Sequence, residues 1–173
     1  DRNLDFEDML ISDYNHIRAF IKIEDGCENF CTYCIIPYVR GSVRSKKFET
    51  VIKEAKVLTQ KGHKEIVLTG IHTGHYMDNN QDLTDLINEL SKIDDLLRIR
   101  ISSIEITELN DKFLNMLSEN KKVCDHLHIP LQAGSNEILK KMNRKYDLKY
   151  YEEKILILKN NFRKNFYSKV QCY

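Results

Sequence analysis

The chain contains 173 residues, of which 42% are hydrophobic, and its 27 basic and 26 acidic side chains leave a formal net charge of +1. This length supports one hydrophobic core without a second full domain, and the balanced charge excludes a strong nonspecific attraction to polyanions over the whole surface. No apolar run approaches the roughly 20 residues that span a bilayer, and the charged opening does not resemble a signal peptide, so we expect a soluble protein.

Strand-like and helix-like stretches alternate along the chain from residue 17 onward. Branched and aromatic side chains in 17–23 predict a buried strand. From Thr50 to Leu58 apolar residues recur at helical spacing, and Gly62 is suited to a left-handed helix end. The segment 65–70 then predicts a second strand.

The next stretch repeats this alternation. Apolar residues from Leu83 to Ile93 lie at helical spacing behind Asp82, which is a good helix N-cap. The segment 97–103 returns to strand alternation, and 110–119 predicts a third helix.

The last third of the chain predicts two strands and two helices. We expect strands at 126–131 and 167–171. Between them, Ser135 is expected to cap a short helix, and Asp147 to cap another that runs to about Asn160.

Strands and helices at this spacing predict an α/β fold with parallel strands joined by crossover connections. Periodicity alone does not separate a barrel from a doubly wound open sheet, because both bury their strands on two faces. In either architecture the functional residues gather at the carboxyl ends of the strands.

Cysteine spacing is the strongest functional signal in the chain. Of five cysteines, Cys27, Cys31 and Cys34 lie within eight residues as CxxxCxxC. This pattern indicates a metal or cluster loop in a reducing compartment, and hence a cytoplasmic location, with an organelle as the alternative. A structural zinc site is the other interpretation, and Cys124, His126 and His128 are the available fourth ligands. The paired cysteines usual for zinc are absent, whereas a three-cysteine iron–sulfur cluster leaves one iron open for a ligand.

The loop that carries these cysteines, KIEDGCENFCTYCIIPYVRGSVRS (22–45), resembles the cluster loop of the radical-SAM methylthiotransferase family, where SAM is S-adenosylmethionine. The likeness continues in the same order through 62–74, 98–109 and 126–146, and covers roughly 17–155. Within the family, the sequence of these segments is most similar to the branch that converts N6-threonylcarbamoyladenosine at position 37 of tRNA to its 2-methylthio form. Sister methylthiotransferases act on isopentenyladenosine in tRNA or on a ribosomal protein, and other radical-SAM reactions share the loop.

The resemblance implies that Cys27, Cys31 and Cys34 hold a 4Fe–4S cluster whose fourth iron binds the amino and carboxylate groups of SAM. Reductive cleavage of SAM would then give a 5′-deoxyadenosyl radical that abstracts hydrogen from adenine C2, while sulfur and a methyl group arrive through a second 4Fe–4S cluster. The implied partners are tRNA and an electron donor of flavodoxin or ferredoxin type.

The family also implies a division into modules. Residues 1–16 would be a linker from a missing N-terminal cluster domain, residues 17–173 an incomplete radical-SAM core, and the C-terminal RNA-binding domain would be absent. The expected fold is therefore a partial, open parallel β/α barrel of the radical-SAM type, truncated. A chain of this extent is not expected to complete sulfur insertion by itself.

Five positions are candidates for binding the cofactor. Tyr33 resembles the aromatic residue that lies against the SAM adenine, although simple loop packing would also explain it. Gly70, Ser103, Glu105 and Gln132 follow strand ends, where a barrel directs side chains at its cofactor. Gly70 is equally compatible with a turn, and Ser103 or Glu105 with a helix cap.

Two basic clusters flank the expected rim and are candidate RNA contacts, although charge runs are commonly solvated faces. Arg40 and Arg44, close to the cysteines, are the preferred substrate-binding residues, together with Arg144. The remaining members are Lys46, Lys47, Lys140, Lys141 and Lys145.

Overall fold

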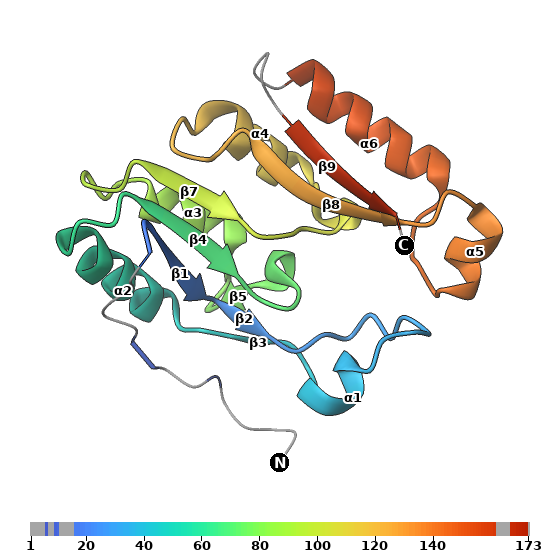
Figure 1. The fold of residues 1–173 in the computed structure, drawn as a ribbon, viewed down its shortest axis with the longest axis horizontal. Helices are drawn as coiled ribbons and strands as arrows, with labels where there is room; N and C mark the ends of the chain where they lie inside the picture. The colour runs from blue at the N-terminus through green and yellow to red at the C-terminus, as the bar shows by residue number, and fades with distance from the viewer. Residues whose placement is uncertain (1–5, 7–8, 11–15, 162–166, 173) are drawn as a thin grey trace.

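The computed structural model describes residues 6, 9–10, 16–161 and 167–172, with side chains described up to Asn160. Five parallel strands form its framework, as expected (Figure 1). They are β1 (Arg18–Lys22), β4 (Glu65–Thr69), β7 (Arg98–Ile101), β8 (His126–Gln132) and β9 (Tyr167–Cys172).

The strands follow one another in space in the order of the sequence. β4 pairs with β1 on one side and β7 on the other, and β8 pairs with β9. A parallel bridge between Ile99 and Val123 connects β7 to the segment that leads into β8, with the Cys124 N–H donating to the Ile99 carbonyl at 2.9 Å. A doubly wound sheet reverses its strand order midway, whereas a barrel winds in one direction. The order therefore favours the barrel-type architecture that periodicity left undecided.

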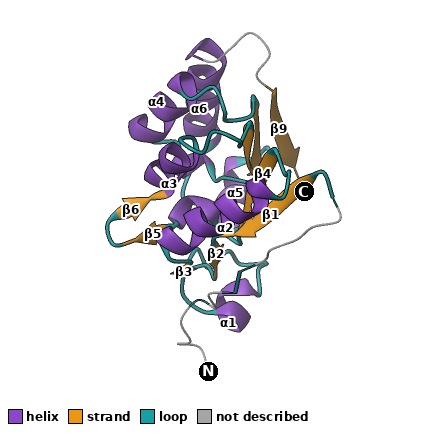
Figure 2. Ribbon diagram, turned by 90° about the vertical axis from the view of Figure 1, so that its left-hand side faces the viewer, coloured by secondary structure: helices purple, strands orange, loops and turns teal. Residues whose placement is uncertain are grey.

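Helices cover one face of these strands and leave the other face open (Figure 2). Ala19 and Ile21 of β1 are fully buried in the core, whereas Arg18, Phe20 and Lys22, which point the opposite way, are exposed. The described sheet is thus an open partial barrel with an uncovered concave face. The covering helices are α2 (Phe48–Gln60), α3 (Leu83–Leu90), α4 (Asp111–Glu119) and α6 (Leu148–Asn161), with a short α5 (Asn136–Lys141) beside them.

Most predicted helix ends are confirmed by their hydrogen bonds. Asp82 accepts from the Asp85 N–H at 3.0 Å, Asp147 accepts from the Tyr150 N–H at 2.8 Å, and Gly62 has φ +99° beyond α2. The expected cap by Ser135 is wrong: this residue occupies the N-cap position of α5, but its side chain makes no capping hydrogen bond.

Several short elements were not predicted, because two to five residues are too few to establish a period. They form the two-stranded pair β2 (Glu24–Asp25) and β3 (Arg44–Ser45), the hairpin β5 (Met77–Asp78) and β6 (Gln81–Asp82), the helix α1 (Ile36–Arg40), and the 3₁₀ turns η1 (Thr73–His75) and η2 (Ile106–Glu108). In the described part of the chain, every helix is too short or too polar to cross a bilayer.

Candidate functional site

The cysteine loop leaves the carboxyl end of the sheet between β2 and β3, and this antiparallel pair closes its base. The Cys27 N–H donates to the Gly41 carbonyl at 3.1 Å. Gly26 has φ +93°, and a Cβ there would stand 2.1 Å from the Ser42 carbonyl oxygen, so only glycine fits. At the other end, the Cys34 N–H donates to the Cys31 carbonyl at 2.9 Å, which places two cysteines on one turn.

Contacts from a distant part of the chain hold the tip of this loop. The Thr32 hydroxyl donates to the Lys141 carbonyl at 2.9 Å, and the Asn143 side-chain amide donates to the Phe30 carbonyl at 3.0 Å. Because Lys141 ends α5 and Asn143 follows it, the loop bridges the first and fourth strand units of the partial barrel.

The described cysteines are free thiols, and Cys31 is 9% exposed. Burial raises the pKa of the Cys31 thiol, and the nearby Arg144 guanidinium opposes this rise. Metal coordination would therefore have to displace a proton that the free site retains.

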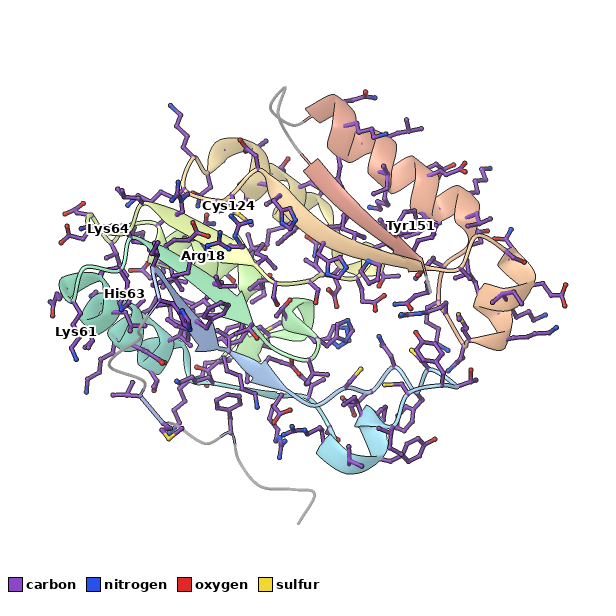
Figure 3. All side chains as sticks on the ribbon, in the orientation of Figure 1. Arg18, Lys61, His63, Lys64, Cys124 and Tyr151 are labelled. Atoms are coloured by element: carbon purple, nitrogen blue, oxygen red, sulfur yellow. The ribbon has the colours of Figure 1, made fainter. Side chains whose placement is uncertain are left out.

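The sulfur arrangement does not resemble a preformed zinc site. Among the described residues, the group of three ligand atoms that lie within 4.8 Å of one another is made by His72, His75 and Glu108, and the three cysteines form no such group. Tetrahedral zinc, with zinc–sulfur bonds of about 2.3 Å, requires sulfurs closer than that, whereas a cubane places several iron atoms between them. Cys124 precedes β8, at the opposite end of the sheet from the cysteine loop (Figure 3). Cys124 is therefore not placed to act as a fourth zinc ligand beside the three cysteines in this structure.

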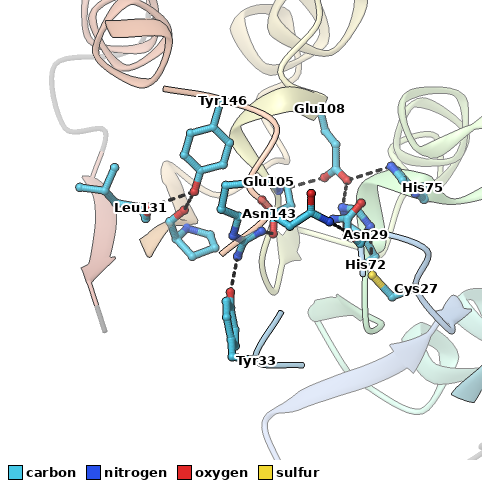
Figure 4. A network of polar contacts seen from close by, with 12 residues as sticks. Cys27, Asn29, Tyr33, His72, His75, Glu105, Glu108, Leu131, Asn143 and Tyr146 are labelled. Carbon is cyan, nitrogen blue, oxygen red and sulfur yellow. Dashed lines mark hydrogen bonds and ion pairs between the residues drawn. The ribbon is translucent and has the colours of Figure 1, made fainter. Parts of the chain in front are cut away.

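Arg144 joins two residues of a polar network near the cysteine loop, Tyr33 and Glu105, which Figure 4 labels. Its guanidinium donates to a Glu105 carboxylate oxygen at 2.8 Å and to the Tyr33 hydroxyl at 2.9 Å. The side chains of Arg144 and Glu105 are 5% and 15% exposed. The buried ion pair therefore links the end of β7, the cysteine loop and the turn after α5. An RNA contact by Arg144 gains no support from this burial, and we propose that it positions Tyr33 and Glu105.

A second network contains histidines that the sequence did not indicate as functional. His72 is 6% exposed; its Nδ1 lies 3.9 Å from the Cys27 Sγ, and its Nε2 meets the Glu108 carboxylate. Burial alone would lower the His72 pKa, but contacts with Cys27 and Glu108 raise it to about 10. The Glu24 carboxylate accepts the His72 backbone N–H at 2.6 Å. Proximity to a predicted strand end was the only sequence signal for His72.

The remaining cofactor candidates lie on the same rim: Gly70 and Ser103 follow β4 and β7, and Gln132 is the last residue of β8. At Gly70 an added Cβ would stand 2.7 Å from a Glu24 carboxylate oxygen, so the absence of a side chain at position 70 leaves room for the buried Glu24 carboxylate. The Ser103 carbonyl accepts the Thr73 hydroxyl, and Gln132 is buried with φ +71°. The role of these residues and of Tyr33 in SAM binding stays a prediction.

The basic residues after the cysteines have partners within the chain. Arg40 and Arg44 each lie 3.5 Å from one carboxylate oxygen of Asp25. Lys46 is buried and pairs with Glu54 at 2.5 Å, so it is not available to a phosphate in this structure. Arg40 is half-exposed and retains a route to an external anion.

Comparisons with known proteins agree with this arrangement. Residues 21–170 match the Radical SAM superfamily. The chain is 48% identical over 145 residues to a threonylcarbamoyladenosine tRNA methylthiotransferase of Bacillus subtilis. This alignment covers 82% of this chain and 32% of that protein. It is 41% identical over 143 residues to a tRNA-2-methylthio-N6-dimethylallyladenosine synthase of Thermodesulfovibrio yellowstonii, covering 83% of this chain and 33% of the other. The chain thus spans about a third of the length of the curated relatives it matches.

Solved structures support the fold. A cobalamin-dependent S-adenosylmethionine radical enzyme superposes with a TM-score of 0.73 at 14% identity, over 88% of this chain and 23% of that one. A radical S-adenosylmethionine methyltransferase from Kitasatospora setae superposes with a TM-score of 0.70 at 15% identity, over 89% of this chain and 30% of that one. Because the family match spans residues 21–170, the chain belongs to the Radical SAM superfamily, and the curated relatives named above are tRNA methylthiotransferases or methylthio-adenosine synthases.

Proposed function

We propose that this chain is the SAM-cleaving core of a tRNA methylthiotransferase. The observation that carries the proposal is the cysteine loop: free Cys27, Cys31 and Cys34 lie on one loop at the carboxyl edge of an open parallel barrel. Membership of the superfamily implies a 4Fe–4S cluster and SAM. We infer that the three cysteines are the cluster ligands.

The chain's own residues would hold the reactants and exclude water. When bound, the cluster and SAM supply a one-electron reductant and a carbon-centred radical. Gly26 and the β2–β3 pair fix the start of the loop, and the hydrogen bonds from Thr32 to the Lys141 carbonyl and from Arg144 to Tyr33 fix its far side against the end of α5 and the turn that follows. A loop held at both ends keeps the reacting atoms in a constant geometry, which is what an effective intramolecular reaction requires.

The proposed substrate is N6-threonylcarbamoyladenosine in tRNA. Support comes from the Bacillus subtilis relative, whose identity of 48% exceeds the 41% to the dimethylallyladenosine enzyme. Relatives of both specificities align with this chain, so the alternative is a dimethylallyladenosine-type substrate. We place tRNA near Arg40 on the rim, and we expect an electron donor of flavodoxin or ferredoxin type.

The first experiment tests radical generation separately from the substrate. The protein is reconstituted anaerobically with iron and sulfide, reduced with dithionite in the presence of SAM, and assayed by chromatography for 5′-deoxyadenosine. We expect the parent protein and C124A to form 5′-deoxyadenosine, and each of C27A, C31A and C34A to form none. Tight binding of one zinc ion, with no cluster and no product, would refute the proposal.

A second experiment tests the substrate with a protein that carries the full length of the relatives. tRNA bearing threonylcarbamoyladenosine and tRNA bearing dimethylallyladenosine are supplied separately, and the nucleosides are analysed by mass spectrometry. We expect methylthiolation of the first only. Modification of the second alone would assign this chain to the sister branch.

A further inference from the structure

The contact between His72 and Cys27 joins the proposed cluster site to a buried carboxylate on another part of the barrel. His72 follows β4, Cys27 follows β2, and Glu108 lies in η2 after β7. The imidazole lies between the sulfur and the carboxylate, with Nδ1 facing Sγ and Nε2 facing Glu108 (Figure 4). Three strand ends thus contribute one residue each to a line of polar contacts.

This line is held in place by its surroundings. The other Glu108 oxygen accepts the Glu105 backbone N–H at 2.9 Å, and the His72 backbone N–H is bound by Glu24. An added Cβ at Gly74 would stand 2.0 Å from a Glu108 carboxylate oxygen, so the glycine leaves just enough room for the carboxylate. The backbone of His72 and the carboxylate of Glu108 are thus each held by a contact outside the line.

The groups at the two ends of this line, a thiolate and a carboxylate, are both hydrogen-bond acceptors. A carboxylate only accepts hydrogen bonds, so Nε2 opposite Glu108 is a donor. A cysteine sulfur bound to iron is a thiolate and likewise only accepts, so Nδ1 is a donor as well. The contact geometry therefore allows an Nδ1–H to point at the sulfur, with the Glu108 carboxylate on the opposite side of the ring.

We propose that His72 donates a hydrogen bond to the sulfur of Cys27 when this cysteine is a cluster ligand, and that it thereby raises the reduction potential of the cluster, with Glu108 as the residue that positions it. Hydrogen bonds to cluster sulfurs are one of the means by which proteins set these potentials. A donor stabilises the reduced cluster more than the oxidised one, because the reduced cluster places more negative charge on its sulfurs. The inference depends on the proposed ligand role of Cys27.

His75 provides a matched control. It lies beside His72 with ring centroids 3.8 Å apart and its Nε2 is 3.7 Å from the same Glu108 oxygen. Its side chain is 43% exposed, and no described contact joins it to a cysteine. A variant of His75 therefore changes the charge and size of the network without removing the sulfur contact.

The test measures the reduction potential of the reconstituted cluster by an electron paramagnetic resonance titration, with iron content and circular dichroism measured on the same samples. For H72L we expect the equilibrium constant for one-electron reduction to fall about tenfold, which is about 59 mV toward more negative potential. E108Q should shift in the same direction by less, and H75N should match the parent. An unchanged potential in H72L, or an equal shift in H75N, would overturn the proposal.

A second pair of variants keeps the test decisive if H72L loses its cluster. Asparagine places its amide near the Nδ1 position and glutamine near the Nε2 position, so H72N retains a donor toward sulfur and H72Q does not. We expect H72N to lie closer to the parent potential than H72Q, and the opposite order would refute the inference. If the parent forms no cluster, the proposed function itself fails. If one metal ion binds through His72, His75 and Glu108 and survives loss of the cysteines, these residues are a metal site instead.

Discussion

Removing the Arg144 guanidinium should destabilise the protein strongly, because it would leave Glu105 charged and buried. Both side chains are largely enclosed, and the guanidinium also binds Tyr33. Removing one partner of a buried ion pair costs about 3–5 kcal/mol of stability. Because Glu105 is partly exposed, we expect R144M to lose about 3 kcal/mol of unfolding free energy, at the lower end of this range. For a chain of this size that corresponds to a fall of about 6–12 °C in Tm.

The assay is urea unfolding followed by circular dichroism for the parent, R144M, E105Q and the double variant. Since either single change leaves the other partner alone in a buried site, the double variant should lose less than the sum of the single losses, by at least about 1.5 kcal/mol. K141M is the control, because its pair with Glu137 is exposed and should contribute less than about 1 kcal/mol. Additive single losses, or a loss in R144M no larger than in K141M, would refute the assigned pairing.

Three further predictions concern local geometry and charge. G70A should lower the free energy of unfolding in urea by about 1–3 kcal/mol, because its Cβ would lie 2.7 Å from a Glu24 oxygen. G134A is the control and should match the parent, because a Cβ there meets open space. Equal stabilities of the two variants would contradict the close approach at Gly70. G62A should lower stability, because φ is +99° there, and G62N should lose less; an unchanged midpoint in G62A would argue against the left-handed helix end. Burial alone would raise the Glu65 pKa, but Arg100, Arg18 and Arg98 lower it. The stability that the ionised Glu65 contributes is therefore present at neutral pH and is lost as the pH falls through the lowered pKa. In E65Q, the unfolding free energy should consequently depend less on pH on the acid side than in the parent. Parallel curves for E65Q and the parent would exclude this contribution.

The sequence determined the local structure to a large degree. Helix stripes, the caps at Asp82 and Asp147, and the five strand segments were read correctly, because each depends on a period or on a residue's own hydrogen-bonding chemistry. The cysteine spacing likewise located the loop, since three thiols within eight residues have few structural explanations, and the ligand role of these cysteines stays a prediction.

Tertiary structure alone decided the winding of the sheet and the partners of the polar residues. Strand periodicity is the same in a barrel and in a doubly wound sheet, so the one-directional order of β1, β4, β7 and β8 had to be observed. Arg144 and Tyr33 are 111 positions apart, and His72 and Cys27 are 45 apart. No local pattern records such contacts, because they form only when the carboxyl ends of neighbouring strands are brought to one rim. The sequence therefore specified which residue types could serve the site, and the packing of the strands determined which of them meet.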